Sequence, residues 1–238
     1  MPRRGAEGDE TPTLLRLLAW MSPSFPTGAF SFSHGLETAI EDGRVKGMSD
    51  LVAYATTALS RGAGRVDTAL LVLAARAMES GDDGALISVA SRAAAMRGSA
   101  ELALESRVQG HAFLATVRAA WPSPAIERPA AVLGAAGIEI THPIAVALAA
   151  TAAGLPLADT IAGFLHGFAA NLVSAGVRLV PLGQTDGQRA LAALEPVVAA
   201  AVGPALAATD LDALGSAAPM IDLLSMRHET QYTRLFRS

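Results

Sequence analysis

Apolar residues recur at helical spacing along almost the whole chain, which is 238 residues long. Residues three, four or seven positions apart share one side of a helix, so such stripes mark helices that bury one face. One stripe consists of Leu51, Tyr54, Ala55, Ala58 and Leu59, and no stretch of alternating Val, Ile or Thr marks a strand. The sequence therefore predicts an all-α fold, a single-domain multi-helix bundle.

Helix boundaries are predicted from capping residues and glycines. Asp82 or Asp83 and Ser99 are suited to begin helices. Thr185 and Gln188 have the spacing of a capping box. We expect helices between Ser49 and Gly62, at Val66–Met78, from Asp82 or Asp83 past Ala93, and at Ser99–Ala119, Pro143–Ala153, Leu157–Val180, Thr185–Ala201, Pro204–Leu214 and Pro219–Met226.

The helical region is flanked by two segments of different character. Residues 1–12 are polar and are predicted to form a flexible arm, and residues 13–226 to form the helical domain. Residues 227–238 form a polar, arginine-containing tail. The proline-rich joint Trp121–Pro129 is short and connects halves of similar composition, so we expect it not to divide the domain.

Composition limits the class of protein. Hydrophobic residues make up 51% of the chain and charged residues 17%. Two charge-free stretches, Ile140–Ala158 and Thr160–Val177, approach the length of a membrane-spanning helix. Both contain a histidine, the first also contains prolines and the second an asparagine. They are therefore predicted to be buried core helices. The N-terminus lacks the pattern of a signal peptide, so we expect a cytoplasmic protein that binds no membrane. A net charge of -4 argues against nucleic-acid binding.

The chain has no cysteine, which excludes disulfides, thiolate metal sites and cysteine nucleophiles. None of its five histidines lies three or four residues from another, so no helical metal site is predicted. His166 lies in an apolar stretch and is predicted to be a hydrogen-bonded core residue, and His142 to cap or turn the chain before Pro143. His34 lies three residues before Glu37, which predicts a local ion pair; a weak metal or partner contact is the alternative.

Glu101 and Glu105 stand four residues apart, and Arg97 precedes Glu101 by one turn. Two carboxylates can carry out acid–base catalysis, but no nucleophile or histidine accompanies them in the sequence. We expect an Arg–Glu pair on a solvated or partner-facing side of a helix. An all-α hydrolase or lyase that uses Glu101 or Glu105 is one alternative, and a purely structural, self-associating helical protein is another.

Two segments are too irregular for generic helices, and the first is Ser22–Glu37, which we name the N-terminal loop. It contains two prolines and three of the seven phenylalanines of the chain. Proline and glycine impose a non-helical path on such a segment. We expect Phe25 to lie in the core, and Phe30 and Phe32 to form a partner-binding edge.

The second irregular segment is the tail, Arg227–Ser238, which combines Tyr232, Leu235 and Phe236 with three arginines. Terminal segments are commonly frayed, whereas aromatic residues and arginine are enriched at the energetic centres of protein interfaces. Two interpretations carry equal weight: the tail docks onto a partner, or it packs back onto its own domain.

In these segments the chain resembles the F-type urease accessory proteins of bacteria. The likeness lies in the N-terminal loop, in Val177–Gln188 and in Met226–Phe236, and the length and helical layout between them fit over nearly the whole chain. The resemblance implies an all-α, non-catalytic protein that forms a homodimer and joins the D-type (also called H-type) accessory protein. That complex recruits the G-type GTPase, and together they deliver nickel to apo-urease in a process coupled to GTP hydrolysis.

The resemblance thus implies an adaptor that positions the GTPase, gates its GTP hydrolysis and helps form a route for the ion, with no cofactor of its own. The tail is the segment that such proteins are expected to order against the D-type partner. No catalytic or metal-binding residue is predicted. The expected partner-binding residues are Phe30, Phe32, Glu37, Arg178, Arg227, His228, Glu229, Gln231, Tyr232, Arg234, Leu235 and Phe236.

Overall fold

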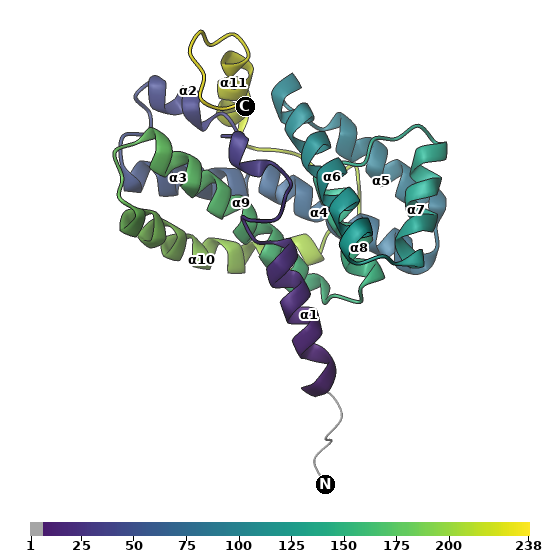
Figure 1. The fold of residues 1–238 in the computed structure, drawn as a ribbon. Coiled ribbons are helices and arrows are strands. Elements are labelled where there is room, and N and C mark those ends of the chain that lie inside the picture. The colour runs from purple at the N-terminus through teal and green to yellow at the C-terminus, as the bar shows by residue number, and fades with distance from the viewer. Residues whose placement is uncertain (1–6) are drawn as a thin grey trace.

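The structure is a computed structural model that describes the backbone of residues 7–238 and the side chains of residues 11–238. Figure 1 shows a fold built of helices, and residues 7–238 contain no strand, so the predicted all-α class is confirmed. The helices are α1 (Glu7–Trp20), the short 3-10 helix η1 (Ala29–Ser31), α2 (Leu36–Glu41), α3 (Met48–Ser60), α4 (Ala63–Ser80), α5 (Asp83–Ala95), α6 (Ala100–Ala120), α7 (Pro124–Ala135), α8 (His142–Ala152), α9 (Leu157–Leu179), α10 (Gln184–Leu206) and α11 (Pro219–His228).

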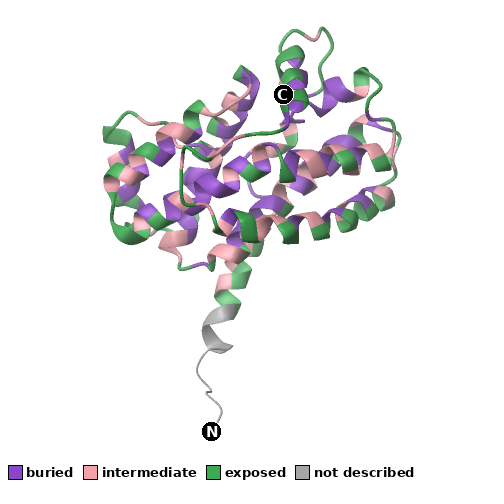
Figure 2. Ribbon diagram, turned by 180° about the vertical axis from the view of Figure 1, so that it is seen from behind, coloured by how far each residue is buried: buried purple, intermediate pink, exposed green. Residues whose placement is uncertain are grey.

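Helix α8 lies in the core, because Ile144, Val146, Leu148 and the alanines between them are all buried. It packs against α4 and α6. This helix comes from the first charge-free stretch, and its apolar character on every side is what allows full burial. Complete burial of one such aliphatic side chain stabilises the fold by about 1.5–3 kcal/mol. Figure 2 shows buried residues along the inner faces of the surrounding helices.

Helices α4, α6 and α8 form one group of packed helices. Helices α9 and α10 pack against each other and, with α3, form a second group. Helix α4 joins the two groups, because it contacts α5 and α8 as well as α3, α9 and α10. One large cluster of buried apolar side chains therefore extends through both groups.

Helix α6 and the start of α8 approach each other closely at Gly110. A Cβ atom there would lie 2.3 Å from the carbonyl oxygen of Ile140 and 2.7 Å from the backbone nitrogen of His142. Both distances are far inside van der Waals contact, and backbone atoms cannot rotate out of the way. The absence of a side chain at Gly110 thus sets how deeply the start of α8 sits against α6.

Two of the predicted N-caps, at Asp82 and at Ser99, are confirmed. The Asp82 carboxylate accepts a hydrogen bond from the Ala85 N–H at 2.9 Å and begins α5. The Ser99 hydroxyl accepts one from the Leu102 N–H at 3.1 Å and begins α6. Each cap satisfies a backbone donor that has no partner inside the helix.

Two other predicted boundaries are wrong. Helix α1 begins at Glu7, inside the predicted flexible arm; residues 1–6 lie outside the described part. Helix α7 occupies most of the predicted joint Trp121–Pro129. Pro124 stands in its first turn, where a proline loses no hydrogen bond.

Helix α10 continues through Pro196 and Pro204 to Leu206, so the predicted separate helix Pro204–Leu214 does not form. Both prolines are exposed. Backbone carbonyls at the C-terminal end of α10 receive hydrogen bonds from another helix. The Arg76 guanidinium of α4 donates to the Leu206 carbonyl at 2.6 Å and also to the carbonyl of Ala208.

Two predicted N-caps are each displaced by two residues. Helix α3 is capped at Gly47 rather than at Ser49, and α10 at Gly183 rather than at Thr185. Neither of the two cap residues uses a side chain, so the capping box predicted for Thr185 and Gln188 is wrong.

Helices α9 and α10 are both long and apolar enough to cross a membrane by length and composition. Half of the most apolar window of α9 is buried inside the fold, against 22% of the corresponding window of α10. Helix α9 packs against α2, α3 and α10, as expected for a core helix. The exposed residues of α10 include four alanines and two prolines, and also Gln188, Arg189 and Glu195.

Candidate functional site

The tail packs back onto its own chain, beside the N-terminal loop and α2 (Figure 1). The Arg237 N–H donates to the carbonyl of Ser31 at 2.8 Å, and the Ser33 N–H donates to the carbonyl of Ser238 at 2.9 Å. Of the two arrangements that the sequence left open, this is packing onto its own domain. The two irregular segments of the sequence are therefore neighbours in space.

The carboxylate of Glu37, in the first turn of α2, holds the tail at three points. It accepts hydrogen bonds from the backbone N–H groups of Leu235 at 2.7 Å and Phe236 at 2.9 Å. Its Oε2 also lies 3.0 Å from Nε2 of His228. The side chain is 9% exposed, so these are interior contacts, in which hydrogen bonds to a charged group are strong.

His228 ends α11 and is completely buried between two acidic side chains. Its Nδ1 lies 2.7 Å from Oε2 of Glu101, on the opposite side of the ring from Glu37. The other oxygen of Glu101 accepts a hydrogen bond from Arg234 at 2.9 Å. A charged network thus connects α2, α6, α11 and the tail.

Glu105, one turn along α6 from Glu101, holds the end of the tail. Its carboxylate accepts hydrogen bonds from the hydroxyl of Ser238 at 3.0 Å and from the side-chain amide of Gln109 at 3.1 Å. The Ser33 hydroxyl completes the contact by donating to the Ser238 carbonyl. We call Glu37, Glu101, Glu105 and His228 the tail anchor.

Three polar contacts surround the tail anchor nearer the surface. Arg227 binds Asp42 through two hydrogen bonds of 2.5 and 2.9 Å, and these hold the pKa of the Asp42 carboxyl below its ordinary value against the opposing effect of burial. Glu229 accepts a hydrogen bond from the Ala100 N–H at 2.8 Å, at the start of α6. These contacts fix α11 and the first residues after it.

The tail also adds aromatic packing. Phe236 is buried, and the guanidinium of Arg178 lies 4.3 Å from its ring centroid. Phe32 is completely buried, and the guanidinium of Arg237 lies 5.5 Å from its ring. Cation–π contacts of this kind contribute about 0.5–1 kcal/mol each at exposed sites.

The structure divides the predicted partner-binding residues into two sets. The first set is buried and cannot touch a partner while the tail is docked: Phe32, Glu37, His228 and Phe236. The second set is exposed or half-buried: Phe30, Arg178, Arg227, Glu229, Gln231, Tyr232, Arg234 and Leu235. Tyr232 is fully exposed and Leu235 is 65% exposed; we call these two residues the tail surface.

The ion pair predicted between His34 and Glu37 is wrong. His34 has a left-handed backbone (φ 58) and precedes α2, so the two side chains are not on one helical face. The imidazole of His34 instead lies 3.5 Å from Glu105. The predicted pair of Arg97 with Glu101 is also wrong, because Arg97 binds Asp67 at 2.9 Å.

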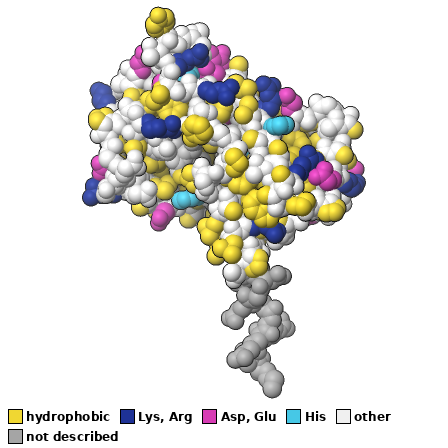
Figure 3. Space-filling model, viewed as in Figure 1, with side chains coloured by type: hydrophobic (Ala, Val, Ile, Leu, Met, Phe, Trp, Pro, Cys, Tyr) yellow, Lys and Arg dark blue, Asp and Glu magenta, His cyan; other side chains and the backbone are white. Residues whose placement is uncertain are grey.

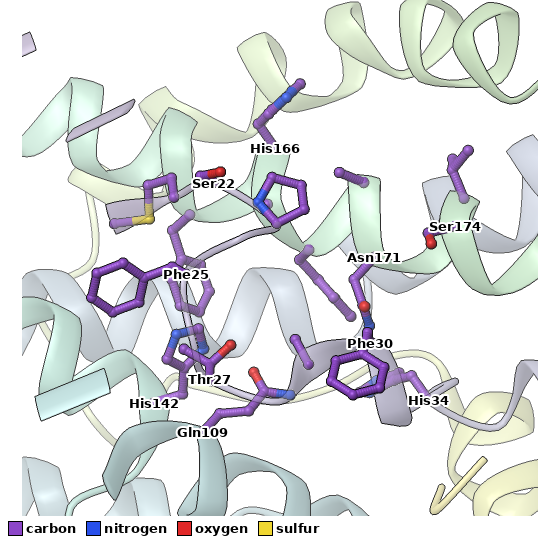
Figure 4. Close-up of a pocket in the computed structure, with 18 of the residues that line it drawn as sticks. Ser22, Phe25, Thr27, Phe30, His34, Gln109, His142, His166, Asn171 and Ser174 are labelled. Atoms are coloured by element: carbon purple, nitrogen blue, oxygen red, sulfur yellow. The ribbon is translucent and has the colours of Figure 1, made fainter. Parts of the chain in front are cut away.

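A cavity of about 520 Å³ lies beside the tail anchor, between the N-terminal loop and helices α4, α6, α8 and α9. Figure 4 shows His34, Gln109 and His142 on one side of it, with Phe25 and Phe30 of the loop. Burial lowers the pKa of His142 to about 4, which keeps it neutral near neutral pH. Phe25 is buried, as predicted.

Two further side chains line this cavity, those of His166 and Asp67. The sequence predicted a different position for His166 and made no prediction for Asp67. His166 is exposed at the cavity mouth, and Figure 4 shows it pointing away from the other labelled side chains, so the predicted core position is wrong. The side chain of Asp67 is 13% exposed, and burial raises the pKa of its carboxyl. No short-range pattern marks Asp67, because its partner Arg97 is 30 residues away.

The carboxylates of Glu101 and Glu105 are buried and form hydrogen bonds with groups of the tail. A general base must be able to reach a substrate, so this arrangement does not suit catalysis. The role as anchor was missed from the sequence, because their partners lie 127 and 133 positions later in the chain. Among the side chains of residues 11–238, no group of three or more His, Asp or Glu residues could hold a metal ion.

Comparison with known proteins gives one consistent family. A family model described as UreF matches residues 45–195. The urease accessory protein UreF of Granulibacter bethesdensis is 51% identical over 225 residues, which cover 94% of this chain and 94% of that protein. The protein of the same name from Rhodopseudomonas palustris strain TIE-1 is 50% identical over 229 residues, 96% of this chain and 94% of that protein. The one from Bradyrhizobium diazoefficiens is 46% identical over 229 residues, 96% and 93% respectively.

Proposed function

Because the chain belongs to the UreF family of urease accessory proteins, we propose that it is a non-catalytic adaptor in the GTP-dependent insertion of nickel into apo-urease. In this role it works in the cytoplasm and bridges the D/H-type accessory protein and the G-type GTPase, whose GTP hydrolysis it gates. Nickel is the cargo of the process, and the chain needs no cofactor of its own.

The tail is the proposed docking site for the D/H-type protein, and the observation that supports this most directly is the contrast between its two sides. Inside, the tail anchor fixes the backbone of Leu235 and Phe236 through Glu37. Outside, Tyr232 and Leu235 expose apolar area to solvent. An aromatic side chain held on a rigid support loses little conformational entropy when it binds, which suits an interface.

Helix α11 offers a second apolar strip next to the tail in sequence. Met220, Leu223 and Met226 are each about half exposed and are spaced three residues apart, so they share one side of the helix. Exposed apolar side chains gathered on one element are typical of interaction surfaces. We include this strip in the docking region that a partner covers.

Helix α1 supports the proposed homodimer. It projects from the body of the molecule (Figure 1), and Leu14, Leu15 and Leu18 are each more than half exposed. Its other side packs on α9 through residues that include Leu17. Figure 3 shows hydrophobic side chains gathered where α1 joins the body. A second copy of the same helix would cover this surface in a two-fold arrangement.

The adaptor function is tested by co-purification of the untagged chain with tagged D/H-type protein and G-type GTPase. We expect all three proteins in one complex, and urease activity in cells that depends on the chain. An adaptor role is wrong if the chain enters no complex with either protein while urease activity still requires it. Turnover of a substrate by the purified chain alone would support the enzyme alternative.

A further inference from the structure

We propose that Arg178 and Arg237 bind carboxylate groups of the D/H-type accessory protein, each through a guanidinium that is held over a phenylalanine ring. We call these two residues the arginine pair. This role rests on the proposed function and deepens it, because it names the chemistry by which the partner is recognised beside the tail surface. Arg237 is not among the partner-binding residues expected from the sequence.

The two rings that support the arginine pair are fixed inside the fold. Phe32 is completely buried, and its backbone carbonyl accepts a hydrogen bond from the side-chain amide of Asn171 at 3.1 Å. Phe236 is buried in the apolar cluster that includes Leu51 and Leu224. Close packing on all sides holds such rings in one orientation. Each ring therefore offers a rigid support for a side chain that lies over it.

Contact with these rings orients both guanidinium groups in advance. The guanidinium carbon of Arg178, in the last turn of α9, lies 4.3 Å from the centroid of the Phe236 ring. That of Arg237 lies 5.5 Å from the centroid of the Phe32 ring. Both distances are within the range of cation–π contact. Nε of Arg178 also donates to the Ser174 carbonyl at 3.1 Å. A long side chain that is already held loses less conformational entropy when it binds a partner.

The positive charge of the arginine pair is not compensated within the described residues. Arg227 and Arg234 of the tail each form an ion pair with a carboxylate, whereas no side chain of residues 11–238 forms one with either member of the arginine pair. Burial lowers the pKa of the Arg178 guanidinium, and no neighbouring carboxylate opposes this effect. Both Nη groups of Arg178 and the whole guanidinium of Arg237 are therefore free to donate to a carboxylate from outside.

The arginine pair borders the tail surface. Exposure alternates along the last residues, since Leu235 and Arg237 are exposed whereas Phe236 and Ser238 are buried. Leu235 and Arg237 therefore share the outward side of the tail. Arg178 is also exposed and covers the ring of Phe236 from α9. Figure 3 shows basic side chains over the region where Figure 1 places the C-terminal end. A partner that covers Leu235 would thus meet both guanidinium groups.

The acidic groups of this region face inward, so the charge that remains outside is positive. Glu37, Glu101 and Glu105 are buried and accept hydrogen bonds from the tail. A guanidinium can bind a carboxylate through two parallel N–H···O bonds, which adds directional specificity to the attraction of opposite charges. The surface therefore fits a partner that presents acidic side chains beside an apolar patch, although the whole chain has a net charge of -4.

The variants Arg178→Met and Arg237→Met test the arginine pair. Methionine keeps an apolar stem and a favourable contact between sulfur and the ring, but it has neither a charge nor an N–H donor. The tail should therefore stay docked in both variants. Arg128→Met is the matched control, because Arg128 is an exposed arginine of α7 that pairs with Asp83, and its loss changes the net charge by the same amount.

Titration calorimetry with the purified D/H-type protein gives the affinity of each variant at about 0.05 M and about 0.5 M NaCl. At the lower salt concentration we expect Arg178→Met and Arg237→Met each to weaken binding about tenfold, because hydrogen bonds to a charged group are lost. At the higher concentration the loss should shrink to about threefold or less, because salt screens exposed charges. Arg128→Met should bind like the parent chain. Hydrogen exchange of the Leu235 and Phe236 amides in the free variants reports whether the tail stays docked.

A loss of affinity that is confined to the arginine pair and shrinks with salt supports the proposal. Equal affinity of the parent chain and both variants overturns it, and so does a loss of the same size at both salt concentrations. If Arg178→Met exposes the tail amides to exchange, Arg237→Met decides, because its ring partner Phe32 is buried independently of the tail's last side chains. A parent chain that does not bind the D/H-type protein at all would overturn the proposed function itself.

Discussion

Glu37 accepts a hydrogen bond from the backbone N–H of Phe236 at 2.9 Å, although the two residues are 199 positions apart in the sequence. This contact unites the two irregular segments of the chain in one structural unit. The N-terminal loop supplies the receiving surface and the tail supplies the residues that remain exposed. A change in either segment should therefore affect the other.

We predict that Glu37→Ala releases the tail and destabilises the fold by about 3–5 kcal/mol, because His228 and two backbone donors lose a buried charged partner. Urea unfolding gives the loss of stability, and tryptic cleavage at Arg234 reports tail release. Glu41→Ala, at an exposed position of the same helix, is the control and should change neither. Unchanged protease resistance in Glu37→Ala would show that the anchor lies elsewhere.

Gly110→Ala should destabilise the protein by about 3 kcal/mol, because the added methyl group meets the backbone at Ile140 and forces α6 away from the start of α8. Gly134→Ala is the matched control. It lies in helix α7 with open space around the added Cβ, so alanine should be neutral or stabilising by up to about 1 kcal/mol. Thermal unfolding of both variants makes the comparison, and equal melting temperatures would contradict the close approach of α6 to the start of α8.

Acid should destabilise the fold through His142. Burial lowers the pKa of its imidazole from 6.5 to about 4, so between these values the unfolded chain binds a proton that the native chain does not. Stability therefore falls as the pH falls through this range, by at most about 3 kcal/mol for this group. In the variant His142→Phe, the midpoint of urea unfolding should fall less steeply as the pH falls through this range. A fall as steep as in the parent chain would show that other groups cause it.

Leu15→Glu combined with Leu18→Glu should convert the proposed homodimer to a monomer, because both side chains are exposed on α1 and charge there opposes burial against a second copy. Multi-angle light scattering after gel filtration gives the mass of each species. Tyr232→Ala is the control and should leave the mass of the dimer unchanged. A parent chain that is monomeric at micromolar concentration would rule out the dimer.

The sequence predicted what depends on neighbours along the chain. The helix starts at Asp82 and Ser99 are set by side chains that cap a backbone group three residues on, and such contacts leave a local pattern. The length of α10 was underestimated because Pro204 was taken as the start of a separate helix, whereas it lies on the exposed side of α10, whose end is capped by Arg76.

The site was predicted in its segments but not in its contacts. The N-terminal loop and the tail were singled out because their composition is irregular, yet nothing in either segment shows that Glu37 binds His228 across 191 positions. Glu101 and Glu105 were placed on a solvated or partner-facing side of a helix, because charged residues are usually exposed. Only the fold reveals that the tail covers these two carboxylates. It also shows that the exposed apolar members of the predicted partner-binding residues are Phe30, Tyr232 and Leu235.

Titration calorimetry with the purified D/H-type accessory protein tests most directly whether the anchored tail displays a docking surface. The double variant Tyr232→Ala and Leu235→Ala leaves the tail anchor intact, because Leu235 is held through its backbone. We expect it to bind at least about thirtyfold more weakly than the parent chain, with unchanged thermal stability. Binding of equal affinity by the two proteins would contradict the claim.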